Sequence, residues 1–134
     1  MPGPFAQLEL CYFIRYVFEC IMTGKTDIRF SFRIFVGGKR YIGPGRVQLM
    51  EGIMKHGSIA KAAQGMNMSY RKAWQMVKDM NAIAKKPLVE KQLGGKSGGG
   101  AFVTEAGKEL MKQYYSIEKQ ATSLFSKAGN TLKI

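Results

Sequence analysis

The sequence has few of the residue types on which metal sites and catalytic centres depend. Its 134 residues include two cysteines, Cys11 and Cys20, whose spacing matches neither a disulfide framework nor a metal-ligand pattern. His56 is the only histidine, so the chain lacks the residues for a zinc site, a Ser-His-Asp triad or a Cys-His pair. We therefore expect no catalytic residues, no metal, no cofactor and no enzymatic activity.

Acidic residues are also scarce. The chain has 9 Asp and Glu against 21 Lys and Arg, which gives a formal net charge of +12 and a pI near 9.9. The excess is spread over most of the chain after Asp27. Such a charge favours a nucleic acid, an acidic membrane surface or an acidic protein as partner, over a solvated basic surface that binds nothing.

The sequence has no hydrophobic run of the length that spans a bilayer. Its most apolar N-terminal stretch, residues 8–22, is too short and contains Arg15 and Glu19. It also lacks the basic start of a signal peptide, and we expect no membrane association. Three interpretations of the N-terminal extension, residues 1–27, stay open: an extra helix packed on the domain, a dimer contact, or a misassigned start, with Met22 as the true first residue.

The rest of the composition is that of one folded domain, 46% hydrophobic and 11% aromatic. Residues 30–36 alternate as in a strand, and Gly37-Gly38 predicts a hairpin that returns over residues 39–42. Gly43-Pro44-Gly45 ends this hairpin. Apolar spacing then predicts a helix over about residues 46–55.

The segment GSIAKAAQGMNMSYRKAW, residues 57–74, predicts two capped helices joined by a turn. Gly57 suits the left-handed end of the preceding helix, Ser58 and Ser69 suit N-caps, and Gly65 permits the turn. This layout is that of a helix-turn-helix, which places its second helix in the DNA major groove. An ordinary αα-hairpin is the alternative, but it leaves the charge of the second helix unexplained.

A glycine-rich hairpin follows the second helix, which Pro87 ends. Residues 88–92 and 101–104 predict short strands around the tip at residues 94–100, which is the wing of a winged helix. The Gly-Lys-Ser triplet in the tip is not a P-loop, because that motif requires a glycine where the sequence has Glu90.

A final amphipathic helix starts after the N-cap Thr104 and extends to about Lys127. Its apolar stripe fits core packing or a dimer seam.

The helix after Ser69 carries the residues that we expect to contact DNA. Arg71, Gln75 and Lys78 share one face, and an arginine can pair with guanine and a glutamine with adenine, each through two hydrogen bonds. Lysines, and polar groups near helix N-termini, suit phosphates. A solvated surface side chain is the alternative for each. The full set of expected DNA-binding residues is Ser58, Lys61, Ser69, Tyr70, Arg71, Lys72, Gln75, Lys78, and Lys96 and Ser97 in the wing.

Over about residues 29–115 the sequence closely resembles the N-terminal DNA-binding domain of the ModE-type molybdate-responsive regulators. It is similar, more distantly, to the winged helix of LysR-type regulators. The matching segments are GPGRVQLMEGIMKHGSIAKAAQGMNMSYRKAW and VKDMNAIAKKPLVEKQLGGKSGGGAFVTEAGKEL. The resemblance implies a dimeric winged helix in which residues 69–78 approach the operator. In that family the molybdate-binding domains follow this domain, whereas the sequence ends at Ile134, so we expect a ModE-like regulator without them.

These observations predict an α+β fold: a winged helix-turn-helix with an N-terminal β-hairpin, a glycine-rich wing and a long C-terminal helix. Its domain is expected over residues 28–115, with residues 116–134 continuing the last helix into a tail. The expected function is a sequence-specific, dimeric transcriptional regulator that binds double-stranded DNA in a bacterial or archaeal cytoplasm, associated with the nucleoid, with no effector identified. The alternatives are an architectural or nonspecific DNA-binding protein and a winged-helix module that binds acidic proteins.

Overall fold

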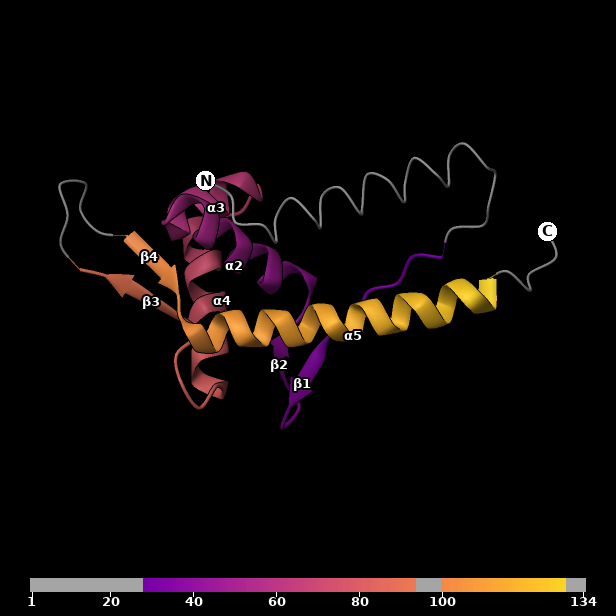
Figure 1. The fold of residues 1–134 in the computed structure, drawn as a ribbon. Coiled ribbons are helices and arrows are strands. Elements are labelled where there is room, and N and C mark those ends of the chain that lie inside the picture. The colour runs from indigo at the N-terminus through magenta and orange to yellow at the C-terminus, as the bar shows by residue number, and fades with distance from the viewer. Residues whose placement is uncertain (1–27, 94–99, 130–134) are drawn as a thin grey trace. The chain divides into compact units, whose positions relative to one another are not determined.

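The computed structural model describes residues 28–93 and 100–129. The described elements are β1 (Ile34–Val36), β2 (Lys39–Ile42), α2 (Pro44–His56), α3 (Ile59–Gly65), α4 (Tyr70–Ile83), β3 (Val89–Gln92), β4 (Gly100–Val103) and α5 (Glu105–Gly129) (Figure 1). The chain divides into two compact units, residues 31–118 and a second that joins residues 1–30 to 119–134. In the described part of the second unit, the rings of Phe30 and Phe125 lie 5.1 Å apart.

The core of the first unit lies where α2, α3 and α4 meet. Its largest fully buried side chains include Leu49, Met50 and Ile53 of α2 and Val77 and Met80 of α4. The small residues that the sequence places on α3 let that helix approach α2 closely: a Cβ added at Gly52 would lie 2.9 Å from the Cβ of Ala62. A three-helix core of this kind holds α4 in one orientation.

Two antiparallel hairpins flank these helices. The β1–β2 hairpin turns at Gly37 and Gly38, which have φ of 56° and 74°, and glycine adopts such angles without a Cβ clash. β3 and β4 pair in register from Val89 with Val103 to Gln92 with Gly100. We refer to the β3–β4 hairpin as the wing. Lys96 and Ser97 of the expected wing tip lie outside the described residues.

The beginning of α5 completes the core with Met111 and Tyr114. Thr104 caps the helix as predicted, since its Oγ1 accepts a hydrogen bond from the Gly107 N–H at 3.2 Å. The Tyr114 hydroxyl donates to the Phe32 carbonyl at 3.3 Å, and the two rings stack 4.4 Å apart. Together these elements confirm the predicted α+β winged helix-turn-helix.

Several predicted boundaries differ from the observed ones. β1 begins at Ile34 instead of residue 30, because β2 has only four residues to pair with it, and a register shift separates Ile34 from Phe35. α2 begins at Pro44, two residues before the prediction, since proline suits the first turn of a helix. α4 ends at Ile83, because Ala84 is extended.

Candidate DNA-binding surface

Local capping positions the two helices of the helix-turn-helix. Gly57 has φ of 66° and its N–H donates to the Ile53 carbonyl at 2.7 Å, which closes α2. Ser58 Oγ accepts from the Lys61 N–H at 3.3 Å, and Ser69 Oγ accepts from the Lys72 N–H at 3.2 Å. Both predicted N-caps are therefore confirmed. Each hydroxyl keeps its own hydrogen to donate, so a phosphate oxygen near either helix start has a donor available.

The two faces of α4 differ in composition. Ala73, Val77 and Met80 are buried against the core. The expected base-reading and phosphate-contacting side chains of this helix, Arg71, Lys72, Gln75 and Lys78, are exposed. Spacings of three and four residues put Arg71, Gln75 and Lys78 on one face. The fold thus holds this polar face away from the core, where a ligand can reach it.

The remaining expected residues lie at the starts of the two helices. Ser69 and Tyr70 begin α4 and are exposed, with Tyr70 at 47%. Ser58 precedes α3 and is half-buried, and Lys61 in its first turn is exposed. All four residues are at least partly exposed. The two serines are structural caps as well as candidate phosphate ligands.

A chain of polar contacts that sequence reasoning missed links α4 to α2. Gln75 Nε2 donates to Asp79 Oδ1 at 2.8 Å, and Asp79 Oδ2 lies 3.6 Å from Arg46 Nη2. Arg46 is only 8% exposed, and its Nη1 donates to the backbone carbonyls of Arg40 and Tyr41, the latter at 3.0 Å. Arg46 therefore joins β2, α2 and α4.

The charge of Arg46 is perturbed by its surroundings. Burial lowers the pKa of the guanidinium from its ordinary value, the Asp79 carboxylate opposes this, and the positive charge of Arg40 adds to the lowering. The sequence did hold a signal for this residue. A basic side chain in the first turn of a helix opposes the helix dipole, so an arginine there calls for a local acidic or carbonyl partner.

Side-chain contacts also hold the wing against α4. The Asn81 amide donates to the Val89 carbonyl at 2.8 Å and accepts from the Leu88 N–H at 2.8 Å. Lys91 Nζ lies 4.1 Å from the ring centroid of Trp74, which is a cation–π contact. The Ala101 N–H donates to the Gly57 carbonyl at 3.0 Å. The wing is thus attached to α4 and to the C-terminal end of α2.

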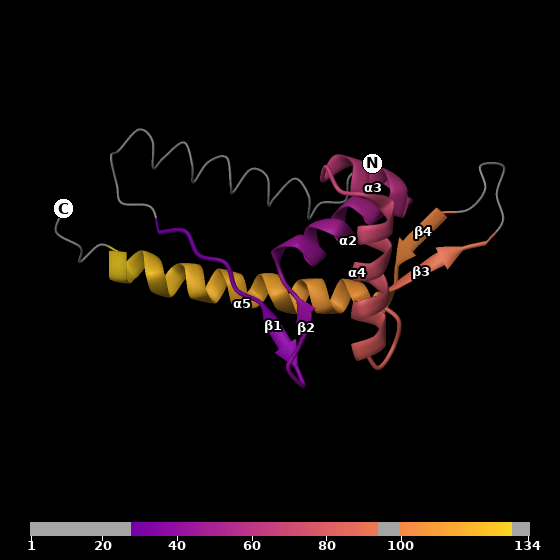
Figure 2. The same cartoon turned by 180° about the vertical axis from the view of Figure 1, so that it is seen from behind.

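The views from both sides place α4 between the wing and the β1–β2 hairpin (Figure 2). The Asn81 and Trp74 contacts lie on the wing side of α4, and the Asp79 pair lies on the hairpin side. The exposed face with Arg71, Gln75 and Lys78 is flanked by these two edges. A ligand that covers this face meets a hairpin on either side.

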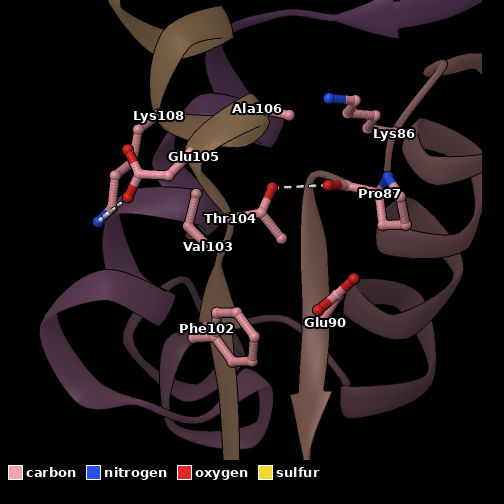
Figure 3. Close-up of a pocket in the computed structure, with 9 residues that line it drawn as sticks. All are labelled: Lys86, Pro87, Glu90, Phe102, Val103, Thr104, Glu105, Ala106 and Lys108. Carbon is pink, nitrogen blue, oxygen red and sulfur yellow. Dashed lines mark hydrogen bonds and ion pairs between the residues drawn. The ribbon is translucent and has the colours of Figure 1, made fainter.

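A pocket at the base of the wing is lined by residues of the loop after α4, the two strands and the start of α5 (Figure 3). Three of its polar side chains are paired with one another or with the backbone. Lys108 Nζ lies 3.2 Å from Glu105 Oε1, and the Thr104 hydroxyl donates to the Pro87 carbonyl at 2.6 Å. The Thr104 bond ties the start of α5 to the loop before β3. Within residues 28–93 and 100–129, no three His, Cys, Asp or Glu side chains are placed to hold a metal ion.

No helix in the described part of the chain is long and apolar enough to cross a membrane.

The model for the bacterial regulatory helix-turn-helix proteins of the lysR family matches residues 45–108, from α2 to the start of α5. The molybdenum-pterin-binding protein MopA of Rhodobacter capsulatus is 41% identical over 85 residues, which cover 63% of this chain and 32% of MopA. The transcriptional regulator ModE of Haemophilus influenzae is 38% identical over 85 residues, 63% of this chain and 33% of that protein.

Residues 45–108 form a helix-turn-helix domain similar to that of the ModE-type regulators. The DNA-binding transcriptional dual regulator ModE of Escherichia coli K12 is also similar, 38% identical over 76 residues that cover 57% of this chain and 29% of the relative. The chain thus spans about a third of the length of the curated relatives it matches. These matches confirm the predicted resemblance to the ModE-type and LysR-type regulators. The matched residues 45–108 include every candidate residue on α3 and α4.

Proposed function

We propose that this protein is a sequence-specific transcriptional regulator that binds double-stranded DNA through its ModE-type domain. The observation that carries the proposal is the division of α4 into a buried apolar face and an exposed face with Arg71, Gln75 and Lys78. The net charge of +12 supports a polyanionic partner. The relatives named ModE are transcriptional regulators, and we assign no enzymatic activity to this chain.

The exposed side chains divide into base-reading and phosphate-binding residues. We assign Arg71 to a guanine and Gln75 to an adenine, each contact contributing about 1–3 kcal/mol of discrimination. The remaining expected residues are assigned to phosphates, which increase affinity without selecting sequence. They are Ser58, Lys61, Ser69, Tyr70, Lys72 and Lys78, together with Lys96 and Ser97 in the wing tip.

Asp79 acts as a positioning residue for Gln75. An amide nitrogen carries two hydrogens, so donating one to Asp79 leaves the Gln75 oxygen and the second N–H for a base. The hydrogen bond of 2.8 Å fixes which atom of the amide is the nitrogen end. The pairing with Arg46 offsets the negative charge of Asp79, which would otherwise repel phosphates next to the base-reading face.

We further propose that two copies bind together through the last helix. Ile117 and Leu124 are two helical turns apart on α5 and are 45% and 66% exposed, which is unusual for apolar residues on a monomeric surface helix. Regulators of this kind read palindromic sites as two-fold dimers. Such a dimer acts at DNA half-sites about one helical turn, or a multiple of it, apart, in the cytoplasm of a bacterial or archaeal cell.

The effector is left open. The name of MopA refers to molybdenum-pterin binding, but this chain covers only 32% of that protein. We therefore propose DNA binding alone for the ModE-type domain.

Selection of bound duplexes from a random library tests the proposal. We expect one enriched motif with two half-sites. Arg71→Ala should weaken binding to the selected duplex by about 5- to 160-fold, which corresponds to the loss of one arginine–guanine contact worth about 1–3 kcal/mol, and should weaken binding to random DNA much less. Lys112→Ala on α5 removes one positive charge elsewhere and is the matched control.

Two results would contradict this function. Binding without any enriched motif would indicate an architectural DNA-binding protein, and the absence of duplex binding at low salt would indicate a winged helix that binds proteins. An equal loss on selected and random DNA would remove Arg71 from base reading.

A further inference from the structure

The β1–β2 hairpin is a basic surface to which the proposed function assigns no role. Residues 31–50 contain Arg33, Lys39, Arg40 and Arg46 and no carboxylate. Arg33, Lys39 and Arg40 are exposed, and in the described part of the chain neither Lys39 nor Arg40 has an ion pair. Only Arg46 is buried and paired. The hairpin thus presents cations that the domain itself does not neutralise.

The hairpin is held at a defined place beside α4. Arg46 donates to the carbonyls of Arg40 and Tyr41 in β2 and pairs with Asp79 of α4. The charge of Arg40 lies near enough to Arg46 to lower its pKa. Lys72 lies on the same edge of α4 as Asp79, two turns earlier. The hairpin that carries Lys39 and Arg40 therefore lies beside this edge of α4, on the side away from the wing.

The geometry of DNA explains why cations belong there. A helix in the major groove has a phosphate strand along each wall of the groove, and about half or more of the hydrogen bonds in such complexes go to phosphate and sugar. The wing lies on one side of α4 and the hairpin on the other (Figure 2). A duplex centred on Arg71 and Gln75 therefore brings one wall toward each hairpin.

We propose that the β1–β2 hairpin is a second DNA-binding element, which places Lys39 and Arg40 against phosphates on the side of α4 opposite the wing. The inference rests on the proposed function, since it requires α4 to occupy the major groove. It predicts a binding site that extends beyond the bases read by α4, without added sequence specificity on that flank.

The double variant Lys39→Gln/Arg40→Gln tests the proposal through the salt dependence of binding. Each lost phosphate contact lowers the slope of log affinity against log salt by about 0.9, so the slope should fall by about 1.8. At 0.1 M salt this corresponds to a loss of up to about 60-fold, similar on selected and random duplexes. Lys108→Gln/Lys112→Gln on α5 removes the same charge and should leave the slope nearly unchanged.

Hydroxyl-radical footprinting locates the contact. The hairpin variant should lose protection of backbone positions at the flank and keep protection around the bases read by α4, whereas the control variant should keep both. An unchanged salt slope, an equal fall in the control, or an unchanged footprint would overturn the proposal.

The outcome is separable from that of the proposed function. If Arg71→Ala still relaxes specificity while the hairpin variant behaves as wild type, the hairpin inference fails alone. If the intact chain binds no duplex, both fail. Phe35 and Val36 at the hairpin tip are 56% and 48% exposed. A change of oligomeric state in Phe35→Ser with an unchanged salt slope in the lysine–arginine variant would assign the hairpin to a protein contact instead.

Discussion

Replacing Asp79 by alanine tests whether a residue that touches no base controls one that does. In the free protein Gln75 is held by the 2.8 Å hydrogen bond to Asp79. Immobilising a long polar side chain on binding costs about 0.5–1.5 kcal/mol. The hydrogen bond to Asp79 already immobilises the Gln75 side chain in the free protein, so this cost is not incurred on binding. Asp79→Ala should therefore weaken binding to the selected duplex by about 2- to 13-fold through this effect.

A second effect of the same substitution has the opposite sign. Removing a carboxylate next to the base-reading face reduces repulsion of phosphates on every duplex, although Arg46 at 3.6 Å and salt already screen it. Absolute affinity therefore mixes two changes. The ratio of affinities for selected and random duplexes isolates the positioning effect, and we expect this ratio to fall.

Competition binding followed by fluorescence anisotropy measures that ratio. Glu109→Ala is the control, because Glu109 accepts from Gln113 Nε2 at 3.3 Å on α5, in an i, i+4 pair of the opposite order. The ratio should fall for Asp79→Ala in the wild-type background and stay constant when Gln75 is already alanine. An unchanged ratio, or the same fall without Gln75, would refute the positioning role.

Three further predictions concern the stability of the domain. Arg46→Met should lower the free energy of unfolding by about 2–3 kcal/mol in urea titrations, because two carbonyls lose a charged donor; a loss below about 1 kcal/mol would contradict that account. Gly107→Ala should cost about 1–3 kcal/mol, since an added Cβ would overlap the Leu88 carbonyl, whereas Gly65→Ala, with nothing within 4 Å, should be neutral or stabilising in the same assay. Burial, reinforced by Glu118, raises the pKa of Tyr114 above its ordinary 10.0, so its contribution to stability is present below pH 10 and lost as the pH rises further. Tyr114→Phe should flatten the fall in urea midpoint between pH 9 and 11, and an unchanged profile would exclude this phenol as the cause.

The helix-turn-helix was predictable because its helix caps and its positive-φ glycine depend on local sequence. Gly57 at positive φ, and Ser58 and Ser69 as caps, depend on backbone within three or four residues. The apolar spacing of α4 likewise follows from one helical period. Such features act through neighbours in the sequence, so the residue types alone indicate where each helix begins and which face it buries.

The extent of β1 was not predictable in the same way. The alternation from residue 30 is typical of a strand, but a strand exists only where a partner supplies hydrogen bonds. The four residues of β2 pair only with residues 34–36. The β propensity of residues 30–36 therefore overestimated the length of β1, because that length is set by how many residues of β2 pair with it.

The sequence by itself determined that this chain carries two capped helices and a basic, polar face on the second of them. Only the tertiary structure decided what surrounds that face. Arg46 and Asp79 are 33 residues apart in the sequence and meet because α2 packs across α4. The same packing places the β1–β2 hairpin and the wing on opposite sides of α4. Caps and periodicity are set by local backbone geometry, whereas these contacts arise from the burial of apolar faces far apart in the sequence.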